Sequence, residues 1–312
     1  MEFNKCLPDY RSKERNVLYI IGNGFDLYHG LNTKYLDFYN WAKDKYPNFV
    51  YMLEHFYKKI DPKDNVHMLW RDFEKALEYN KDLREIHKFT LDYISDFESL
   101  PVEKQKTFAS EKVKETLDQI APLLNEWANS FTKKYKDVRK LLPLGRNSKY
   151  ITFNYTRVLE DVYGIGGEEH VWHIHGSVDE GRAITGYYNN LSSGAIYGTA
   201  IEEASEKRIL QELQKMQKPT EEIFVNGPDT FKNLNDINTI IVIGHSLADV
   251  DMPYFKYMLD DMPIYVDIEW QYWVHNDEAK TKAKERIRQL CDDANFEEKM
   301  AESKWKYYIM DD

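Results

Sequence analysis

The stretch Leu18-Tyr-Ile-Ile-Gly-Asn-Gly-Phe-Asp26 decides the fold. Residues 17–21 form a short run of aliphatic and aromatic side chains, which predicts a buried strand. Gly22 and Gly24 follow directly, and glycines at a strand end permit a tight turn and close approach of a ligand to backbone amides. Since amides beside a helix N-terminus attract phosphate, the stretch predicts either a nucleotide-binding turn or a plain strand-to-helix connection. The full G-x-G-x-x-G pattern is absent, because Leu27 occupies its third glycine position.

The composition is that of a globular protein with 312 residues, 42% of them hydrophobic and 30% charged. A net charge of −11 disfavours bulk attraction to nucleic acid or to an anionic membrane. The two cysteines, Cys6 and Cys291, cannot build a cysteine-type zinc site. Neither a signal peptide nor an apolar run of the roughly 20 residues in a membrane helix is apparent, so we expect a cytoplasmic protein.

Helical periodicity follows the first strand. Residues 1–15 are polar and predict a flexible lead-in, whereas Thr33 is a candidate N-cap for a helix that Pro47 closes. Beyond residue 49, apolar side chains recur at helical spacing in three stripes. These stripes are Val66 to Leu77, Leu83 to Phe97, and Val113 to Phe131, the last with a bend at Pro122. This region predicts three or four helices without an intervening strand.

From residue 149 the pattern changes to short apolar strands. The expected strands are 150–153, 171–175, 182–187, 239–243, 264–268 and 306–310, with helices at about 201–218 and 278–291. Apolar strands separated by helices predict an α/β fold with a Rossmann-like, mainly parallel sheet covered on both faces. We expect residues 1–45 and 145–312 to form this core, and residues 46–144 to form an early inserted helical subdomain.

Four of the expected strands end in small or polar residues. These ends are Gly22-Asn-Gly-Phe-Asp26, Asn154-Tyr-Thr156, His175-Gly-Ser177 and Gly244-His-Ser246. Ligands of open parallel sheets bind at the carboxyl ends of the strands. The four ends together therefore predict one shared ligand site.

The residue types at these ends allow several kinds of chemistry. Asn154 either closes a turn or orients a water or ribose hydroxyl. His173 and His175 face the same side of a strand. His175 is then a candidate general base with His173 as a core histidine, or both are structural, or the pair binds a metal. The candidate third metal ligands are Asp26, Asp249 and Asp251.

Two further motifs have both a structural and a functional interpretation. Asp249 and Asp251 either cap the helix that Pro253 begins or line the site together with Ser246. In Trp70-Arg-Asp-Phe-Glu74, the carboxylate either lines a nucleoside pocket or lies at the solvated edge of a core tryptophan.

The motifs in their order resemble those of the bacterial AbiH family of phage abortive-infection proteins. They are Ile20-Ile-Gly-Asn-Gly-Phe-Asp-Leu27, Trp70 with Phe73-Glu74, Thr152-Phe-Asn-Tyr-Thr156, His173-Ile-His-Gly-Ser177 and Gly244-His-Ser-Leu-Ala-Asp-Val-Asp251. That family is in turn similar to sirtuin-like NAD-binding domains, including the NAD-hydrolysing branch used in phage defence. The resemblance covers residues 17–258 and implies a sirtuin-like core.

The resemblance implies a catalytic pair. Asn154 corresponds to the asparagine that positions the nicotinamide ribose or the attacking water, and His175 to the histidine that acts on ribose hydroxyl protons. The residues expected to contact the nucleotide are Gly22, Asn23, Gly24, Phe25, Asp26, Glu74, Ser246, Asp249 and Asp251. Asn23 and Asp26 stand where the sirtuin pattern has Ala and Ser, which predicts a narrower phosphate site or a different nucleotide. The paired cysteines of sirtuin deacetylases are absent, so deacetylation is not expected.

The leading hypothesis is an antiviral NAD glycohydrolase that depletes NAD in infected cells. NAD would be its substrate, with no prosthetic group and no resident metal, and a homo-oligomer or a defence-system partner is expected by analogy. One alternative is a non-catalytic nucleotide-binding sensor regulated by a partner. The other alternative is a metal-dependent hydrolase that uses His173 and His175.

Overall fold

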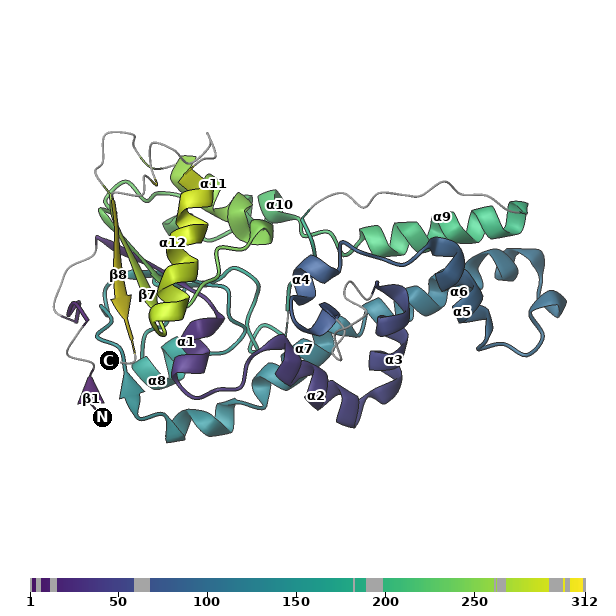
Figure 1. The fold of residues 1–312 in the computed structure, drawn as a ribbon, viewed down its shortest axis with the longest axis horizontal. Coiled ribbons are helices and arrows are strands. Elements are labelled where there is room, and N and C mark those ends of the chain that lie inside the picture. The colour runs from purple at the N-terminus through teal and green to yellow at the C-terminus, as the bar shows by residue number, and fades with distance from the viewer. Residues whose placement is uncertain are drawn as a thin grey trace. The chain divides into compact units, whose positions relative to one another are not determined.

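The chain folds into two compact units (Figure 1). The computed structural model describes residues 2–3, 7–11, 16–58, 68–181, 183–188, 199–260, 262, 268–291, 300 and 304–310. The first unit comprises Met1–Thr33, Ala128–Ala183 and Pro219–Asp312. The second unit comprises Lys34–Trp127 and Ile184–Lys218.

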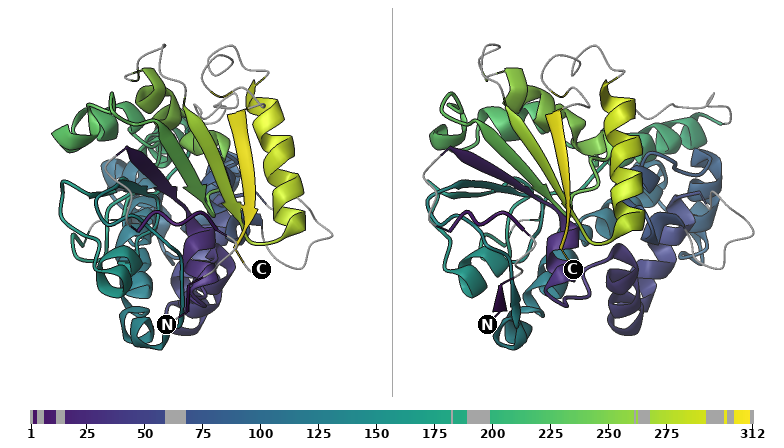
Figure 2. Two further views of the ribbon diagram at one scale, coloured as in Figure 1. Left: turned by 90° about the vertical axis from the view of Figure 1, so that its left-hand side faces the viewer. Right: turned by 60° about the vertical axis from the view of Figure 1, so that its left-hand side comes forward.

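The first unit is built on a six-stranded sheet in which all strands are parallel. The strands are β2 (Val17–Ile21), β4 (Lys149–Thr152), β5 (Val171–His173), β6 (Thr239–Ile243), β7 (Glu269–Val274) and β8 (Trp305–Ile309). Their spatial order is β5-β4-β2-β6-β7-β8, visible side by side in Figure 2. Numbered along the chain, this is the order 3-2-1-4-5-6 of doubly wound Rossmann domains. The prediction of an α/β fold with a Rossmann-like parallel sheet is confirmed.

The order of the strands reverses between β2 and β6. The chain leaves β2 toward β4 and β5, and it later returns to the other side of β2 through β6, β7 and β8. In open parallel sheets, the crevice outside the carboxyl ends at such a switch point is the usual ligand site. The switch point therefore lies between the turn after Ile21 and the turn after Ile243.

Apolar residues on one face of the sheet pack against helices from the C-terminal half. Ile20, Val242 and Trp270 belong to one buried cluster with side chains of α10 (Thr220–Val225), α11 (Met252–Asp260) and α12 (Asp277–Cys291). Successive strand residues point to opposite faces. The other face therefore presents side chains such as Tyr19 and Trp273, whose rings contact Tyr10.

The expectation of a flexible lead-in is wrong for the described part of residues 1–15. β1 (Glu2–Phe3) pairs with β3 (Lys140–Leu141) in a small parallel sheet. Tyr10 is buried on the main sheet, and its hydroxyl accepts a hydrogen bond from the side chain of Gln271. Burial of a large aromatic ring outweighs the polar character of the segment around it.

Two expected strands differ from the structure. Residues 264–267 lie outside the described residues, and the strand that follows β6 is β7, which the sequence did not predict. For the expected strand 182–187, Arg182 lies outside the described residues and 183–186 are not in a strand. Tyr187 forms an isolated bridge with Gln217.

The second unit is helical, which confirms the early helical region. Its helices are α2 (Tyr35–Lys45), α3 (Pro47–Phe56), α4 (Phe73–Ala76), α5 (Leu83–Leu91), α6 (Val102–Leu117), most of α7 (Ile120–Asn129) and α9 (Ala200–Gln214), with 3-10 turns at Met68–Trp70 and Phe97–Ser99. Phe38 contacts the rings of Trp70 and Trp127 in its core. α9 returns from a distant part of the chain and packs along α6 (Figure 1).

Details of the helices differ from the predictions. Thr33 does not cap a helix, because α2 begins at Tyr35 and the N–H of Lys34 donates to Asp37. Val66, the first member of one predicted stripe, lies outside the described residues. The third stripe is split between α6 and α7, and Pro122 occupies the first turn of α7, where a proline is tolerated. In the described part of the chain, every helix is too short or too polar to cross a bilayer.

Candidate functional site

Glycines bring the ends of β2 and β6 into direct contact. The N–H of Gly22 donates to the carbonyl of Ile243 at 2.9 Å, and the N–H of Gly24 donates to that of Gly244 at 2.8 Å. A Cβ on Gly22 would lie 2.4 Å from the Cα of His245, and one on Gly24 would lie 2.6 Å from the Cα of Gly244. No side chain fits at these distances, so both positions require glycine for backbone packing at the switch point.

This packing occupies two of the amides expected to bind phosphate. α1 (Asn23–Tyr28) starts directly after Gly22, and within the described residues the N–H of Asn23 makes no hydrogen bond. The side chain of Asn23 accepts a hydrogen bond from the Thr33 hydroxyl at 2.5 Å. Phosphate binding by this turn stays a prediction, and the Asn23 N–H is its available donor.

Asn154 is held at the point where β2, β4 and β5 end. Its Nδ2 donates to the carbonyl of Gly22 at 3.1 Å, and its own N–H donates to the Thr152 hydroxyl at 3.2 Å. Its carbonyl accepts from Nδ1 of His173 at 3.0 Å. These three contacts fix a buried amide beside the switch point, which suits a positioning role.

Asp26 lies in α1 with only 2% of its surface exposed. Oδ2 accepts a hydrogen bond from the Thr156 hydroxyl at 2.6 Å, and Oδ1 has no hydrogen-bond partner in the described part of the chain. Burial raises the pKa of Asp26 to about 7, although the side chains of Thr156 and Asn154 and the charge of His173 favour the ionised form. A carboxyl group that titrates near neutrality in a site can act as an acid or a base.

His173 has both ring nitrogens engaged with protein atoms. Nδ1 donates to the Asn154 carbonyl, and Nε2 lies 2.9 Å from Oε1 of Glu160. Across the residues that the structure describes, no three His, Cys, Asp or Glu side chains are grouped to hold a metal ion. The metal-binding alternative for His173 and His175 therefore has no geometric support in this part of the chain.

A carboxylate lies between two imidazoles at the ends of β5 and β6. Oδ1 of Asp251 lies 3.8 Å from Nε2 of His175, and Oδ2 of Asp251 lies 3.4 Å from Nε2 of His245. All three side chains are buried. The ring of Phe153 contacts both imidazoles edge to face, at centroid distances of 5.1 Å and 4.2 Å. The His175–Asp251–His245 cluster thus brings three buried titratable side chains together at the strand ends.

Sequence reasoning missed His245. In the motif Gly244-His-Ser246, the pattern indicates a role only for the serine. The available signal is the position of His245 at the second residue after its strand, which Asn23, Asn154 and His175 share. The sequence does not reveal that His245 and Asp251 lie close together, because their distance depends on the path of the residues between them.

A family model described as bacteriophage abortive infection AbiH matches residues 18–272. The chain belongs to the AbiH family. The match includes the glycine turn, Asn154, His175, His245 and Asp251, so the whole site lies within the family region. Comparison with curated proteins and with solved structures gave no match.

Other predicted site residues of this AbiH protein have different surroundings. Ser246 is exposed, and Asp249, whose side chain is 78% exposed, pairs with Arg286 of α12 at 2.6 Å. Phe25 is buried and its ring packs against His29 and Tyr163.

Glu74 belongs to the second unit of this AbiH protein, whereas the strand ends belong to the first unit. Its Oε1 lies 2.7 Å from Nζ of Lys218, a fully buried ammonium group, and accepts a hydrogen bond from the Thr185 hydroxyl at 3.4 Å. The prediction of a solvated Glu74 is wrong, because this side chain is buried and paired with Lys218.

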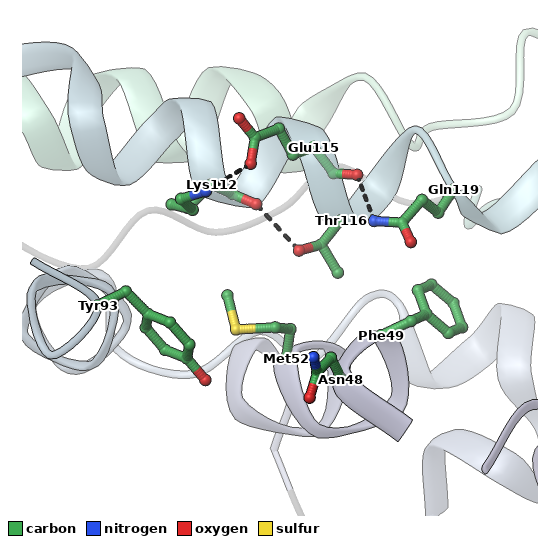
Figure 3. Close-up of a pocket in the computed structure, with 8 residues that line it drawn as sticks. All are labelled: Asn48, Phe49, Met52, Tyr93, Lys112, Glu115, Thr116 and Gln119. Carbon is green, nitrogen blue, oxygen red and sulfur yellow. Dashed lines mark hydrogen bonds and ion pairs between the residues drawn. The ribbon is translucent and has the colours of Figure 1, made fainter. Parts of the chain in front are cut away.

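The second unit also has a shallow hollow between α3 and α6 (Figure 3). Phe49 and Met52 project into it from α3, and Tyr93 lies at its side. Lys112 and Glu115 pair with each other on α6 at 2.7 Å. The residues that line the hollow include no histidine and no buried carboxylate.

Proposed function

We propose that this AbiH protein acts in phage defence by hydrolysing the N-glycosidic bond between nicotinamide and ribose in NAD. The observation that carries the proposal is a fixed asparagine amide after β4 together with a histidine–carboxylate pair that follows the carboxyl ends of β5 and β6. These groups flank the switch point of a doubly wound sheet, which is the position where dinucleotides bind in such sheets.

The reaction needs orientation and one proton acceptor. The C1′–N bond breaks, nicotinamide leaves with the bonding electron pair, and the ribose carbon gains oxocarbenium character. Water adds to C1′, and His175 takes the proton that the water loses, so the products are nicotinamide, ADP-ribose and a proton. Asn154 holds the water or the ribose in line, which lowers the entropic part of the barrier.

Asp251 supports this role of His175. When an imidazole accepts a proton it becomes a cation, and a carboxylate nearby stabilises that cation most strongly where water is excluded. Oδ1 of Asp251 is 3.8 Å from the ring, and both side chains are buried. Catalytic hydrogen bonds that are long in a free enzyme shorten when the ligand binds.

The proposal is tested by measuring NAD in bacteria that express the chain and are infected with phage. We expect the wild type to lose NAD with release of nicotinamide, and Asn154→Ala or His175→Ala to reduce the rate at least about 100-fold, the range of general base catalysis. Matched controls are His170→Ala and Asn238→Ala, which alter the same residue types at the amino ends of β5 and β6. We expect both controls to deplete NAD as the wild type does.

Two outcomes would overturn the proposal. One is protection against phage with unchanged NAD in the wild type. The other is equal NAD loss in the wild type and in the Asn154→Ala His175→Ala double variant. Nucleotide binding by the purified chain without any turnover after infection would instead support a nucleotide-binding sensor.

A further inference from the structure

We propose that His245 is a positioning residue that acts through Asp251 to fix the proton of His175 on Nε2. Nδ1 of His175 is then the nitrogen that exchanges a proton with the ligand. The second statement rests on the proposed function. The first statement concerns the free protein and does not depend on any reaction.

The tautomer of His245 follows from its backbone contact. The N–H of Leu247 donates to Nδ1 of His245 at 3.0 Å, so Nδ1 carries a lone pair. A neutral imidazole with an unprotonated Nδ1 carries its proton on Nε2. That nitrogen faces Oδ2 of Asp251 at 3.4 Å. In this neutral tautomer His245 presents an N–H group, and not a positive charge, beside the carboxylate of Asp251.

Several independent contacts keep His245 in place. The Tyr272 hydroxyl donates to its carbonyl, and the ring of Phe153 packs on its imidazole. Its Cα lies against Gly22, where no side chain could be accommodated. Leu247 has φ of 54°, an unfavourable conformation for a leucine, and its N–H is the donor to Nδ1. The fold thus holds a strained loop in the geometry that fixes this imidazole.

The carboxylate of Asp251 links the fixed imidazole of His245 to His175. With Oδ2 facing the Nε2 proton of His245, Oδ1 remains toward Nε2 of His175. The rings of Tyr254 and Phe153 pack on His175, so the carboxylate acts in apolar surroundings where its attraction for a proton is strong. His245 and Asp251 come from one connection, between β6 and α11, whereas His175 comes from β5. The connection therefore places the N–H group of His245 and the carboxylate of Asp251 beside His175, which follows another strand.

The test is the nitrogen-15 NMR spectrum of the histidine rings in the full chain without ligand, which distinguishes the two neutral tautomers. His245→Gln keeps an N–H donor near the position of Nε2, whereas His245→Asn keeps an acceptor for the Leu247 N–H and cannot reach Asp251. We expect one tautomer of His175, with its proton on Nε2, in the wild type and in His245→Gln. In His245→Asn we expect a mixture of tautomers. The same single tautomer in all three proteins would overturn the proposal.

A variant that replaces Asp251 keeps the test decisive if His245→Asn does not fold. Asp251→Asn removes the charge, so His175 is expected to lose its single tautomer there as well, and an unchanged tautomer would contradict the proposal. Where NAD is cleaved, His245→Asn is expected to lower kcat about tenfold or more at nearly constant KM, with partial recovery in His245→Gln. Absence of NAD cleavage would reject the proposed function, whereas the NMR result would still decide the role of His245.

Discussion

Asp26 is a single residue whose charge opposes folding. Its pKa is about 7 in the folded chain because burial disfavours the carboxylate, against an ordinary value of 3.8. The folded state therefore binds the proton more tightly than the unfolded state does. The resulting free-energy penalty is absent below about pH 4, grows as the pH rises, and is complete above about pH 7. Over that interval it amounts to about 4 kcal/mol.

Asp26→Asn should remove this penalty, since the amide oxygen can still accept the Thr156 hydroxyl. We expect the variant to gain up to about 4 kcal/mol in free energy of unfolding at pH 8, and almost nothing at pH 4. Urea denaturation at the two pH values measures the difference. An equal effect at both values would mean that folding does not raise the pKa of Asp26. A stabilised variant that no longer binds nucleotide would identify Asp26 as a residue kept for function.

At the scale of elements, a buried ion pair joins two segments of the second unit. Lys218 follows α9 and Glu74 belongs to α4, and their charged atoms are 2.7 Å apart. Removing one partner leaves a buried charge without compensation, which costs about 3–5 kcal/mol, whereas replacing both by apolar residues is often neutral. We expect Lys218→Met to destabilise the protein by that amount and Glu74→Leu Lys218→Met to recover most of it. Urea denaturation of the singles and the double completes the cycle.

A matched control for this cycle is the exposed pair Lys282 and Glu278 on α12. Its removal is expected to leave the free energy of unfolding nearly unchanged, because solvent screens exposed ion pairs. A double variant of Glu74 and Lys218 as unstable as Lys218→Met would show that the cost came from lost packing. The exposed pair shows how much the free energy of unfolding changes when an ion pair that is not buried is removed.

Two strands, β2 and β6, could be predicted from the sequence, whereas β7 could not. The apolar runs of β2 and β6 predict their strands because all of β2 and residues 240–243 of β6 are buried on both faces. β7 was missed because Gln271 interrupts its apolar pattern. That glutamine is buried, and it is satisfied by the Tyr10 hydroxyl and the indole of Trp273, partners that local periodicity cannot reveal. Asn154 and His175 were predicted from their strand ends, whereas His245 needed the position of Asp251 in space.

The whole molecule consists of two units formed from interleaved segments. The second unit depends on α9, which lies about a hundred residues beyond α6 in the sequence and packs along it. Ile209 and Leu213 of α9 are fully buried there. Each unit is compact by itself, as expected for domains that open separately. The two units should therefore differ in their response to a cavity in the helical core.

Ile209→Ala is expected to destabilise the second unit by about 2–5 kcal/mol, because it removes buried methyl groups and leaves a cavity. Hydrogen exchange measured by mass spectrometry should then accelerate in α6 and α9 by about 30-fold or more, while β2 and β6 keep the wild-type rate. Gln211→Ala, at an exposed position of the same helix, should leave both regions unchanged. Equal acceleration in the helices and in the central strands would mean that the two units unfold as one. Retention of nucleotide binding by Ile209→Ala would separate the site at the strand ends from the stability of the helical unit.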